Sequence, residues 1–169
     1  MTISTIRVRA AKPADVPQIQ EIREPFISQR VLLGRELVEL YESVQEMLVA
    51  VDEADRVVGC GALHVMWKDL AEVRSVVVDQ NRRGQGVGQL IVEALLERAR
   101  DLGIRRVFCL TFEVDFFAKL GFEPVADAPV DPETYAELVR SSDEGIAEFL
   151  DLARVKQNTL GNTRMLRLL

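Results

Sequence analysis

Cysteine, histidine and aromatic residues are scarce in this 169-residue sequence. Cys60 and Cys109 are the two cysteines, both inside apolar runs, and His64 is the single histidine. Buried free cysteines behave as small apolar residues, whereas zinc sites need clustered cysteine and histidine ligands. The sequence therefore favours neither a disulfide framework nor a zinc centre, and we predict no bound metal.

Long apolar runs and a surplus of basic residues are also missing. No apolar run approaches the roughly 18 residues of a membrane span, and the N-terminal MTISTIRVRAAKPADV lacks the apolar segment of a signal peptide. The formal net charge is −6, from 21 basic and 27 acidic side chains. Nucleic acids and anionic membranes need a dominant basic face. We therefore expect a cytoplasmic protein that binds neither nucleic acid nor a membrane.

The remaining composition is that of an ordinary globular protein, with 48% apolar and 28% charged residues. The length favours a single domain over residues 1–169. Alternating polarity predicts strands at 5–9, two within 46–67 joined by the turn DEAD, and further strands at 71–79, 105–112 and 163–169. Helical spacing predicts helices near 12–24, 36–44, 87–102 and 113–121, and an acidic helical tract over 129–152. This order indicates an α/β (α+β) fold, with a mixed sheet covered by helices on both faces.

Three glycines at alternate positions separate the strand at 71–79 from the clearest helix. Gly84, Gly86 and Gly88 directly follow Arg82 and Arg83. The first turn of a helix exposes unpaired N–H groups and favours negative charge, and glycine lets a ligand approach that backbone closely. The arginines would add charge-assisted contacts. The pattern therefore predicts a phosphate site, the alternative being a flexible turn with solvated arginines.

Two common nucleotide-binding patterns do not fit this turn. The Walker A pattern needs Gly-Lys-Ser/Thr at the start of the helix, and here the helix begins Gly-Val-Gly-Gln. The Rossmann fingerprint G-x-G-x-x-G is not met, because the run is G-x-G-x-G. We therefore expect a phosphate ligand of another kind.

Residues 76–99, VVVDQNRRGQGVGQLIVEALLERA, resemble motif A of the GCN5-related N-acetyltransferases. The signature Q/R-x-x-G-x-G/A stands here as Arg83, Gly84, Gln85, Gly86, Val87 and Gly88. The run FFAKLGFEPV resembles the final motif of the same family. The resemblance implies a mostly antiparallel central sheet and acetyl-CoA as co-substrate, without a metal. It also implies that the pyrophosphate binds the amides of Arg83 to Gly88, and that the pantetheine arm follows the backbone of Val76, Val77 and Val78 where the strands splay.

Acetyl transfer to an amine needs a group that accepts the amine proton and donors for the developing oxyanion. Glu72 is the predicted base, because strict strand alternation places it on the face of Val76 and Val78. It also resembles the strand glutamate that many family members use through a water molecule. A surface ion pair between Glu72 and Arg74 is the alternative interpretation.

Phe117 stands where family members commonly carry a tyrosine that protonates the leaving thiolate. Phenylalanine cannot donate a proton. We therefore expect that water protonates the leaving thiolate, or that no acid is required because a thiolate is only weakly basic. Phe116 and Phe117 are predicted to pack around the cofactor. A non-catalytic acyl-CoA-sensing module therefore stays an alternative. His64 is expected to be a hydrogen-bonded structural residue.

A narrower resemblance concerns the acceptor. The runs LAEVRSVVVD, LTFEVDFFAKLGF and NTRMLRLL resemble the acetyltransferase domain of N-acetylglutamate synthases, particularly its single-domain type. This implies an amino-acid N-acetyltransferase that acts on the α-amine of L-glutamate or L-glutamine in the first step of arginine biosynthesis. N-acetyltransferases for polyamines, aminoglycosides or proteins are the alternatives on the same fold.

An acidic acceptor needs cations that hold its carboxylates while the α-amine stays free. Arg35, Arg74 and Arg164 are the predicted cations, and Asn162 would add a neutral hydrogen bond. Lys156 is a weaker candidate. Solvation at the surface is the alternative for each cation. Exposed strand edges permit a homodimer without requiring one.

Overall fold

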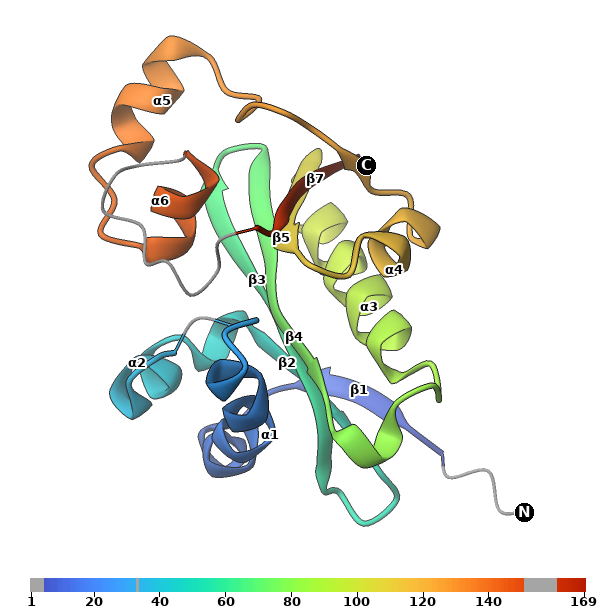
Figure 1. The fold of residues 1–169 in the computed structure, drawn as a ribbon. Coiled ribbons are helices and arrows are strands. Elements are labelled where there is room, and N and C mark those ends of the chain that lie inside the picture. The colour runs from blue at the N-terminus through green and yellow to red at the C-terminus, as the bar shows by residue number, and fades with distance from the viewer. Residues whose placement is uncertain (1–4, 33, 151–160) are drawn as a thin grey trace.

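The computed structural model describes residues 5–32, 34–150 and 161–169 (Figure 1). Within these ranges, seven strands form a sheet in the order β1-β2-β3-β4-β5-β7-β6. All neighbouring strands are antiparallel except β4 and β5, which are parallel. The strands are β1 (Arg7–Ala10), β2 (Met47–Val51), β3 (Val57–Trp67), β4 (Leu70–Val78), β5 (Arg106–Thr111), β6 (Glu123–Pro124) and β7 (Thr163–Leu168).

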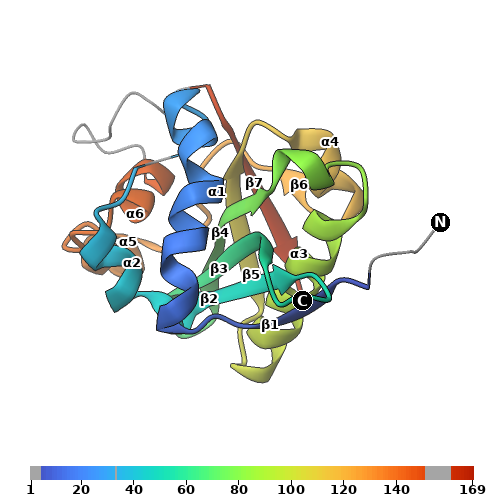
Figure 2. The ribbon, with the colours of Figure 1, turned by 90° about the horizontal axis from the view of Figure 1, so that it is seen from below.

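Helices cover both faces of the sheet (Figures 1 and 2). Helices α3 and α4 lie on one face, and α1, α2, α5 and α6 lie on the other. The α-helices are α1 (Val16–Ser28), α2 (Leu37–Glu42), α3 (Val87–Asp101), α4 (Val114–Lys119), α5 (Pro132–Leu138) and α6 (Glu144–Phe149). Short 3-10 turns are η1 (Pro13–Asp15), η2 (Val44–Glu46) and η3 (Gln80–Arg82). The predicted mixed, mostly antiparallel sheet with helices on both faces is confirmed.

The largest core lies between α3 and the sheet. Val87, Ile91 and Leu95 of α3 are buried there, as the helical spacing predicted. Leu90 and Leu102 continue the same spacing of apolar residues in the sequence, but they are 41% and 55% exposed. Val92 and Leu96 take their places, because the buried face of the helix is rotated by part of a turn. Gly103, just beyond the helix, has φ 79° and ends it in the predicted left-handed conformation.

Strand β4 contains a bulge at Ser75. This residue has φ 56°, a left-handed conformation that is uncommon for a residue with a side chain. The pairing with β3 shifts from Cys60↔Val77 to Ala62↔Arg74, so β4 advances three residues while β3 advances two. The extra residue reverses the faces to which the following side chains point.

The bulge corrects one prediction made from strict alternation. Val76 and Val78 pack on the α3 side of the sheet together with Val73, whereas Val77 joins the buried cluster beneath α1. The prediction that Glu72 shares a face with Val76 and Val78 is therefore wrong. Alternation holds only along an uninterrupted strand, and the bulge lies between these residues.

Strands β4 and β5 separate along their length. Their parallel pairing consists of Leu70↔Arg106, Ala71↔Val107 and Glu72↔Phe108. Beyond Glu72, β4 continues to Val78 beside β3, while β5 continues beside β7. The sheet therefore opens between β4 and β5 from Glu72 onward, toward the end where the glycine turn leads into α3.

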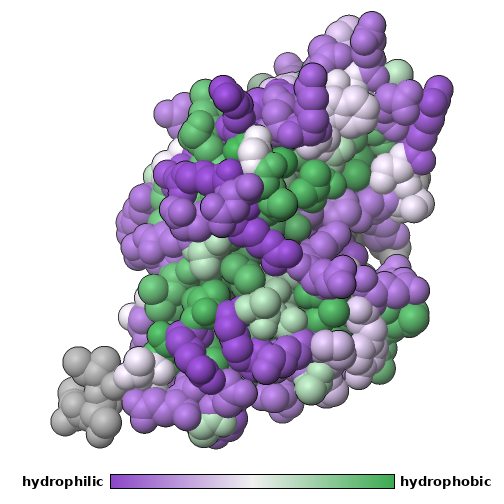
Figure 3. Space-filling model, turned by 180° about the vertical axis from the view of Figure 1, so that it is seen from behind, coloured by the Kyte–Doolittle hydropathy of each residue, from purple (hydrophilic) through white to green (hydrophobic). Residues whose placement is uncertain are grey.

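The surface is mixed in character. Seen from behind, hydrophobic side chains show in patches between hydrophilic ones (Figure 3). In the described ranges, no helix has both the length and the apolar character required for a transmembrane segment.

Candidate functional site

The glycine turn holds the start of α3 open. Gly84 and Gly86 have φ 75° and 77°, and a Cβ built on either would meet no atom within 4 Å. Gly86 is the N-cap of α3, and the first helical hydrogen bond runs from the Leu90 amide to its carbonyl at 3.1 Å. The amides of the first turn therefore face an open space without intrahelical acceptors. This geometry suits an anionic ligand that contacts the backbone.

The two arginines before the turn are held by different neighbours. Nη2 of Arg82 lies 3.5 Å from Oδ2 of Asp52, which is buried at the end of β2. The Arg83 guanidinium lies over the ring of Phe26 in α1, 5.5 Å from its centroid. Arg83 itself is exposed. Its charge is thus available at the turn while the aromatic ring limits its orientations.

Two phenylalanines pack behind this turn. The half-buried Phe116 ring would lie 3.2 Å from a Cβ on Gly88, so this glycine allows the ring to approach the helix. Phe117 is 6% exposed and makes edge-on contacts with Phe116 and Phe122, at centroid distances of 5.0 and 5.2 Å. The structure therefore places Phe117 in the core and Phe116 beside the glycine turn.

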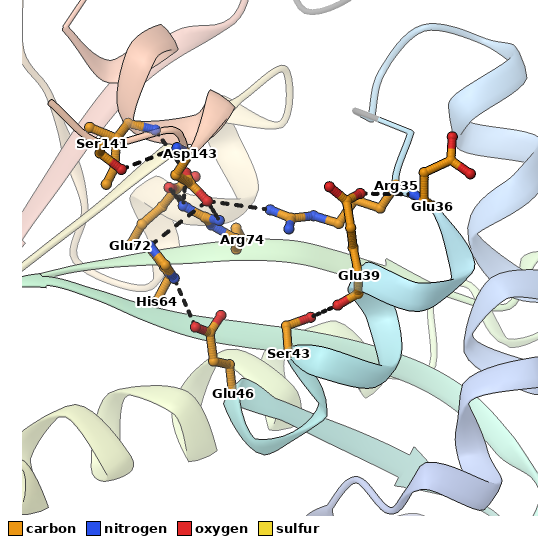
Figure 4. A network of polar contacts seen from close by, with 11 residues as sticks. Arg35, Glu36, Glu39, Ser43, Glu46, His64, Glu72, Arg74, Ser141 and Asp143 are labelled. Carbon is orange, nitrogen blue, oxygen red and sulfur yellow. Dashed lines mark hydrogen bonds and ion pairs between the residues drawn. The ribbon is translucent and has the colours of Figure 1, made fainter. Parts of the chain in front are cut away.

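Glu72 lies in a buried cluster of three charges (Figure 4). Arg74 donates from Nε and Nη2 to Oε2 of Glu72, at 3.1 and 2.7 Å. The same guanidinium donates from Nη1 and Nη2 to the two carboxylate oxygens of Asp143, at 2.9 and 2.8 Å. The side chains of Glu72 and Arg74 are 6% and 8% exposed. Arg74 thus uses all but one of its N–H groups on two carboxylates of its own chain.

The electrostatics of this cluster favour its charged forms. Burial would lower the pKa of Arg74, but the charges and hydrogen bonds of Glu72 and Asp143 outweigh it, and the pKa is raised. Burial would raise the pKa of Asp143, but the Arg74 guanidinium holds that pKa well below its usual range. The carboxylates of Glu72 and Asp143 therefore share one guanidinium.

His64 and Arg35 approach the same cluster from the other side. Nδ1 of His64 lies 2.9 Å from Oε1 of Glu46, and its Nε2 lies 3.8 Å from Oδ2 of Asp143. Nη2 of Arg35 lies 4.0 Å from the same Asp143 oxygen. Figure 4 shows these side chains converging from β3, η2 and the segment before α2. The structure therefore brings the predicted Glu72, Arg74 and Arg35 together around Asp143.

An open pocket of about 770 Å³ adjoins this cluster. It lies between α1, the segment that leads into α2, and the residues that precede α6. Arg23, Arg35 and His64 contribute cationic or proton-binding groups, and Glu39 and Asp143 are among its acids. Burial lowers the pKa of Arg23, which is 1% exposed. The mixed charge of the lining is suited to a small ligand that carries both a cation and an anion.

The two predicted ligands near the C-terminus are engaged elsewhere. Arg164 donates from Nη1 to the Ala126 carbonyl at 2.6 Å and from Nη2 to the Phe149 carbonyl at 2.5 Å. Its guanidinium also lies 5.5 Å from the centroid of the Phe149 ring. The Asn162 amide donates to Glu148 of α6. These contacts of Arg164 and Asn162 connect β7 to α6 and to the segment after β6. All of these elements are far from Arg35 in the sequence. Lys156 lies outside the described residues.

Asp143 and Arg23 escaped the sequence analysis, and His64 was interpreted as structural. Asp143 is separated from Arg74 by 69 positions and stands in the acidic tract predicted over 129–152. The one available signal was its position before α6, where its carboxylate caps the helix by accepting from the Ile146 amide at 3.0 Å. Among the described residues, no group of three or more potential ligands is arranged to hold a metal ion.

Comparisons with known proteins identify the family. Residues 17–122, well over half of the chain, match the Acetyltransferase (GNAT) family. The chain belongs to this family of acetyltransferases. It is 51% identical over 164 residues to an amino-acid acetyltransferase of Mycobacterium tuberculosis. The aligned residues cover 96% of this chain and 94% of that protein.

Solved structures of this GNAT fold support the architecture. The crystal structure of Rv2747 from Mycobacterium tuberculosis in complex with CoA and NLQ superposes with a TM-score of 0.93 at 51% identity, covering 96% of this chain and 99% of that one. The N-acetylglutamate synthase of Neisseria gonorrhoeae, complexed with coenzyme A and N-acetyl-glutamate, gives a TM-score of 0.78 at 23% identity. This chain corresponds to 35% of that synthase, and the similarity at this identity concerns the fold.

Proposed function

We propose that this chain is an amino-acid N-acetyltransferase, which transfers the acetyl group of acetyl-CoA to the α-amine of L-glutamate or L-glutamine. The observation that carries the proposal is the position of Glu72. The pairing of β4 with β5 ends at Glu72, and its partner Arg74 contacts Asp143 on the wall of the pocket. The gap that leads to the glycine turn therefore ends at Glu72, which is linked to the pocket wall through Arg74 and Asp143.

The residues around the gap fit acetyl-CoA. The open backbone at Gly84 and Gly86, with the start of α3, would bind the pyrophosphate through amides, assisted by Arg83. The unpaired edge of β4 from Val76 to Val78 would bind the amides of the pantetheine arm. When bound, acetyl-CoA supplies an activated acetyl group as a thioester. Gln85, Val87 and Gly88 would contribute through their backbone, and Phe117 would support the site from the core.

Glu72 is the group that removes the proton in the proposed mechanism. Through a water molecule, its carboxylate would accept a proton from the acceptor ammonium and leave a nucleophilic amine. A C–N bond then forms and the C–S bond breaks, while a β4 amide near Val76 donates to the developing oxyanion. The bulge at Ser75 turns this part of β4 out of regular pairing. The attacking nitrogen would lose its second proton to water, and water would protonate the departing thiolate, since Phe117 cannot donate a proton.

Arg35 is the cation best placed for an acceptor carboxylate. It lines the pocket, is 24% exposed and lies 4.0 Å from the nearest Asp143 oxygen. Arg74, Arg164 and Asn162 were also proposed as ligands, but each already donates hydrogen bonds to acceptors within the chain. We therefore assign the main carboxylate contact to Arg35 and a supporting charge to Arg23.

The relatives extend the proposal to a cellular role. The similar mycobacterial protein is an amino-acid acetyltransferase, and the gonococcal structure contains N-acetyl-glutamate. On this basis we place residues 1–169, as one N-acetyltransferase domain, at the first step of arginine biosynthesis in the cytoplasm.

The test is thiol release from acetyl-CoA in the presence of single acceptors. L-Glutamate and L-glutamine should support rapid release, whereas spermidine, an aminoglycoside and a lysine peptide should not. Release with one of those other amines alone would retain the GNAT chemistry and contradict the amino-acid assignment. Tight binding of acetyl-CoA without release for any acceptor would indicate the sensing module that Phe117 leaves open.

A further inference from the structure

Asp143 is the carboxylate on which three elements of the site converge. It stands at the N-cap of α6, accepts two hydrogen bonds from Arg74, and lies 3.8 and 4.0 Å from His64 and Arg35. Its side chain is 18% exposed, so its position on the wall of the pocket is fixed largely by these contacts. The sequence places it in an acidic tract, and its relation to the base arises only from the fold.

We propose that Asp143 is a positioning residue for acetyl transfer, which shares Arg74 with Glu72 and so preserves the ability of Glu72 to accept a proton. This inference rests on the proposed function, in which Glu72 is the base. A guanidinium that contacts a single carboxylate stabilises its charged form and makes it a poorer base. A second carboxylate on the same guanidinium offsets that effect. Asp143 also fixes the orientation of Arg74, because both terminal nitrogens donate to it.

The packing around Gly145 indicates that this arrangement is built into the fold. A Cβ on Gly145 would lie 2.8 Å from Nη2 of Arg74, 3.0 Å from Oε2 of Glu72 and 3.1 Å from Oδ1 of Asp143. A distance of 2.8 Å is closer than real Cβ atoms approach a neighbour, so with any other residue here the Arg74 guanidinium or the start of α6 would have to shift. The start of α6 thus covers the base and supplies the second carboxylate at once.

Other ionisable groups lie around Glu72, and any test has to separate their effects from the effect of Asp143. His64 on β3 is paired with Glu72 in the sheet, and its side chain contacts Glu46. On β5, burial raises the pKa of the Cys109 thiol and the charge of Glu72 raises it further. The groups that surround Glu72 or its partners are therefore Arg74 on β4, His64 on β3, Cys109 on β5, Asp143, Glu144 and Glu148 at α6, and Arg35 and Glu46 near α2.

The experiment compares Asp143→Asn with Asp131→Asn in pH profiles of kcat and kcat/KM. Asparagine caps helices about as well as aspartate, so Asp143→Asn removes the charge and retains the cap. Asp131 is a matched control, since it caps α5 by accepting from the Thr134 amide at 2.9 Å. Among the described contacts, Asp131 has none to Arg74.

Asp143→Asn should move the acid limb of the kcat/KM profile to lower pH by about one unit. The sign follows because a nearby negative charge is lost and Arg74 is left to Glu72, and both changes favour the ionised base. The plateau of kcat should fall about tenfold, because a weaker base transfers the proton less readily. The KM for acetyl-CoA should stay within about twofold, and Asp131→Asn should leave the profile in place.

The same substitution in a His64→Gln background separates the two titrating groups. If Asp143 acts on Glu72, the acid limb of the kcat/KM profile should shift in the His64→Gln background as well. Loss of this shift in that background would assign the effect to His64 and overturn the proposal. An unmoved limb in Asp143→Asn would overturn it as well. A lower KM for the amino acid at unchanged kcat would also overturn the proposal. Asp143 would then merely occupy the place of a substrate carboxylate. Lack of turnover in the unsubstituted protein would instead be a failure of the proposed function.

Discussion

Gly145 and Arg74 are so close that a Cβ on the glycine would lie 2.8 Å from Nη2 of the arginine. A side chain at this position would therefore force the Arg74 guanidinium or the start of α6 to move. We expect Gly145→Ala to displace the start of α6 and to cost about 1–3 kcal/mol of stability, as overpacking does. A chain of this size should then melt about 2–4 °C lower for each kcal/mol lost, together with a reduced kcat.

Thermal denaturation and steady-state turnover would check this expectation. Gly34→Ala is a control for stability, because a Cβ there would lie in ordinary contact, 3.6 Å from Cγ2 of Ile27. Equal melting temperatures for the two variants would contradict the close contact at Gly145.

Substitution of the base is the most direct test of the chemistry. Glu72→Gln preserves the size of the side chain and removes its ability to accept a proton. The kcat should fall by roughly two to four orders of magnitude, the range attributed to general-base catalysis. The KM for acetyl-CoA should change little, since Glu72 is not proposed to bind it. Turnover close to that of the unsubstituted protein at all pH values would show that another group removes the proton.

The glycine turn can be tested with a matched pair of substitutions. Gly86→Ala and Gly103→Ala each place a side chain at a positive φ, 77° and 79°, where open space surrounds the Cβ. Each should cost roughly 1 kcal/mol or more through backbone strain alone. Calorimetric titration with CoA should show at least about tenfold weaker binding for Gly86→Ala, because charge-assisted contacts of ~1.5–3 kcal/mol would be disturbed. Equal CoA affinity in the two variants would contradict the backbone site.

Arg35 should determine the affinity for the acceptor. Arg35→Ala removes the cation assigned to the acceptor carboxylate and should raise the KM for glutamate or glutamine about tenfold or more, since hydrogen bonds to charged groups contribute about 1.5–3 kcal/mol. The KM for acetyl-CoA should stay unchanged. Arg105→Ala, at an exposed arginine just before β5, serves as the control for a general loss of positive charge. If both variants raise the acceptor KM equally, Arg35 makes no specific contact.

Arg164 offers a choice between two roles. Its guanidinium donates to the carbonyls of Ala126 and Phe149, so we expect Arg164→Lys to lose about 2 kcal/mol of stability and to keep its acceptor KM. Denaturant unfolding and steady-state kinetics on the same preparation would separate the outcomes. A raised acceptor KM at unchanged stability would restore the substrate contact predicted from the sequence.

Local patterns were sufficient to predict the main elements and the glycine turn before α3. The glycines, the buried stripe of α3 and the strand that carries Glu72 and Arg74 all depend on neighbours within a few positions. The faces of Val76 and Val78 were mispredicted because a valine-rich strand gives no local sign that Ser75 adopts a left-handed conformation. Tertiary contacts override periodicity at such points.

The acceptor side was less predictable for the same physical reason. Leu37 and Tyr41 stand at helical spacing from Leu40 and Val44, but each is 42% exposed, whereas Leu40 is 2% exposed. Helix α2 ends after six residues, so its pattern continues into the differently wound turn η2. The partnership of Asp143 with Arg74 spans 69 positions, and no local pattern could indicate it.

The narrow junction between β4 and β5 has a bearing on how long the protein survives in a cell. In the described strands, three residue pairs join the β1–β4 half of the sheet to the β5–β7 half. A co-substrate that fills the gap would bridge the halves, and at a hundredfold excess over its Kd it would add about 2.7 kcal/mol of stability. Proteases cleave the opened form in proportion to its population. Degradation would therefore slow when acetyl-CoA is plentiful and quicken when it is scarce, so that enzyme abundance follows the acetyl supply.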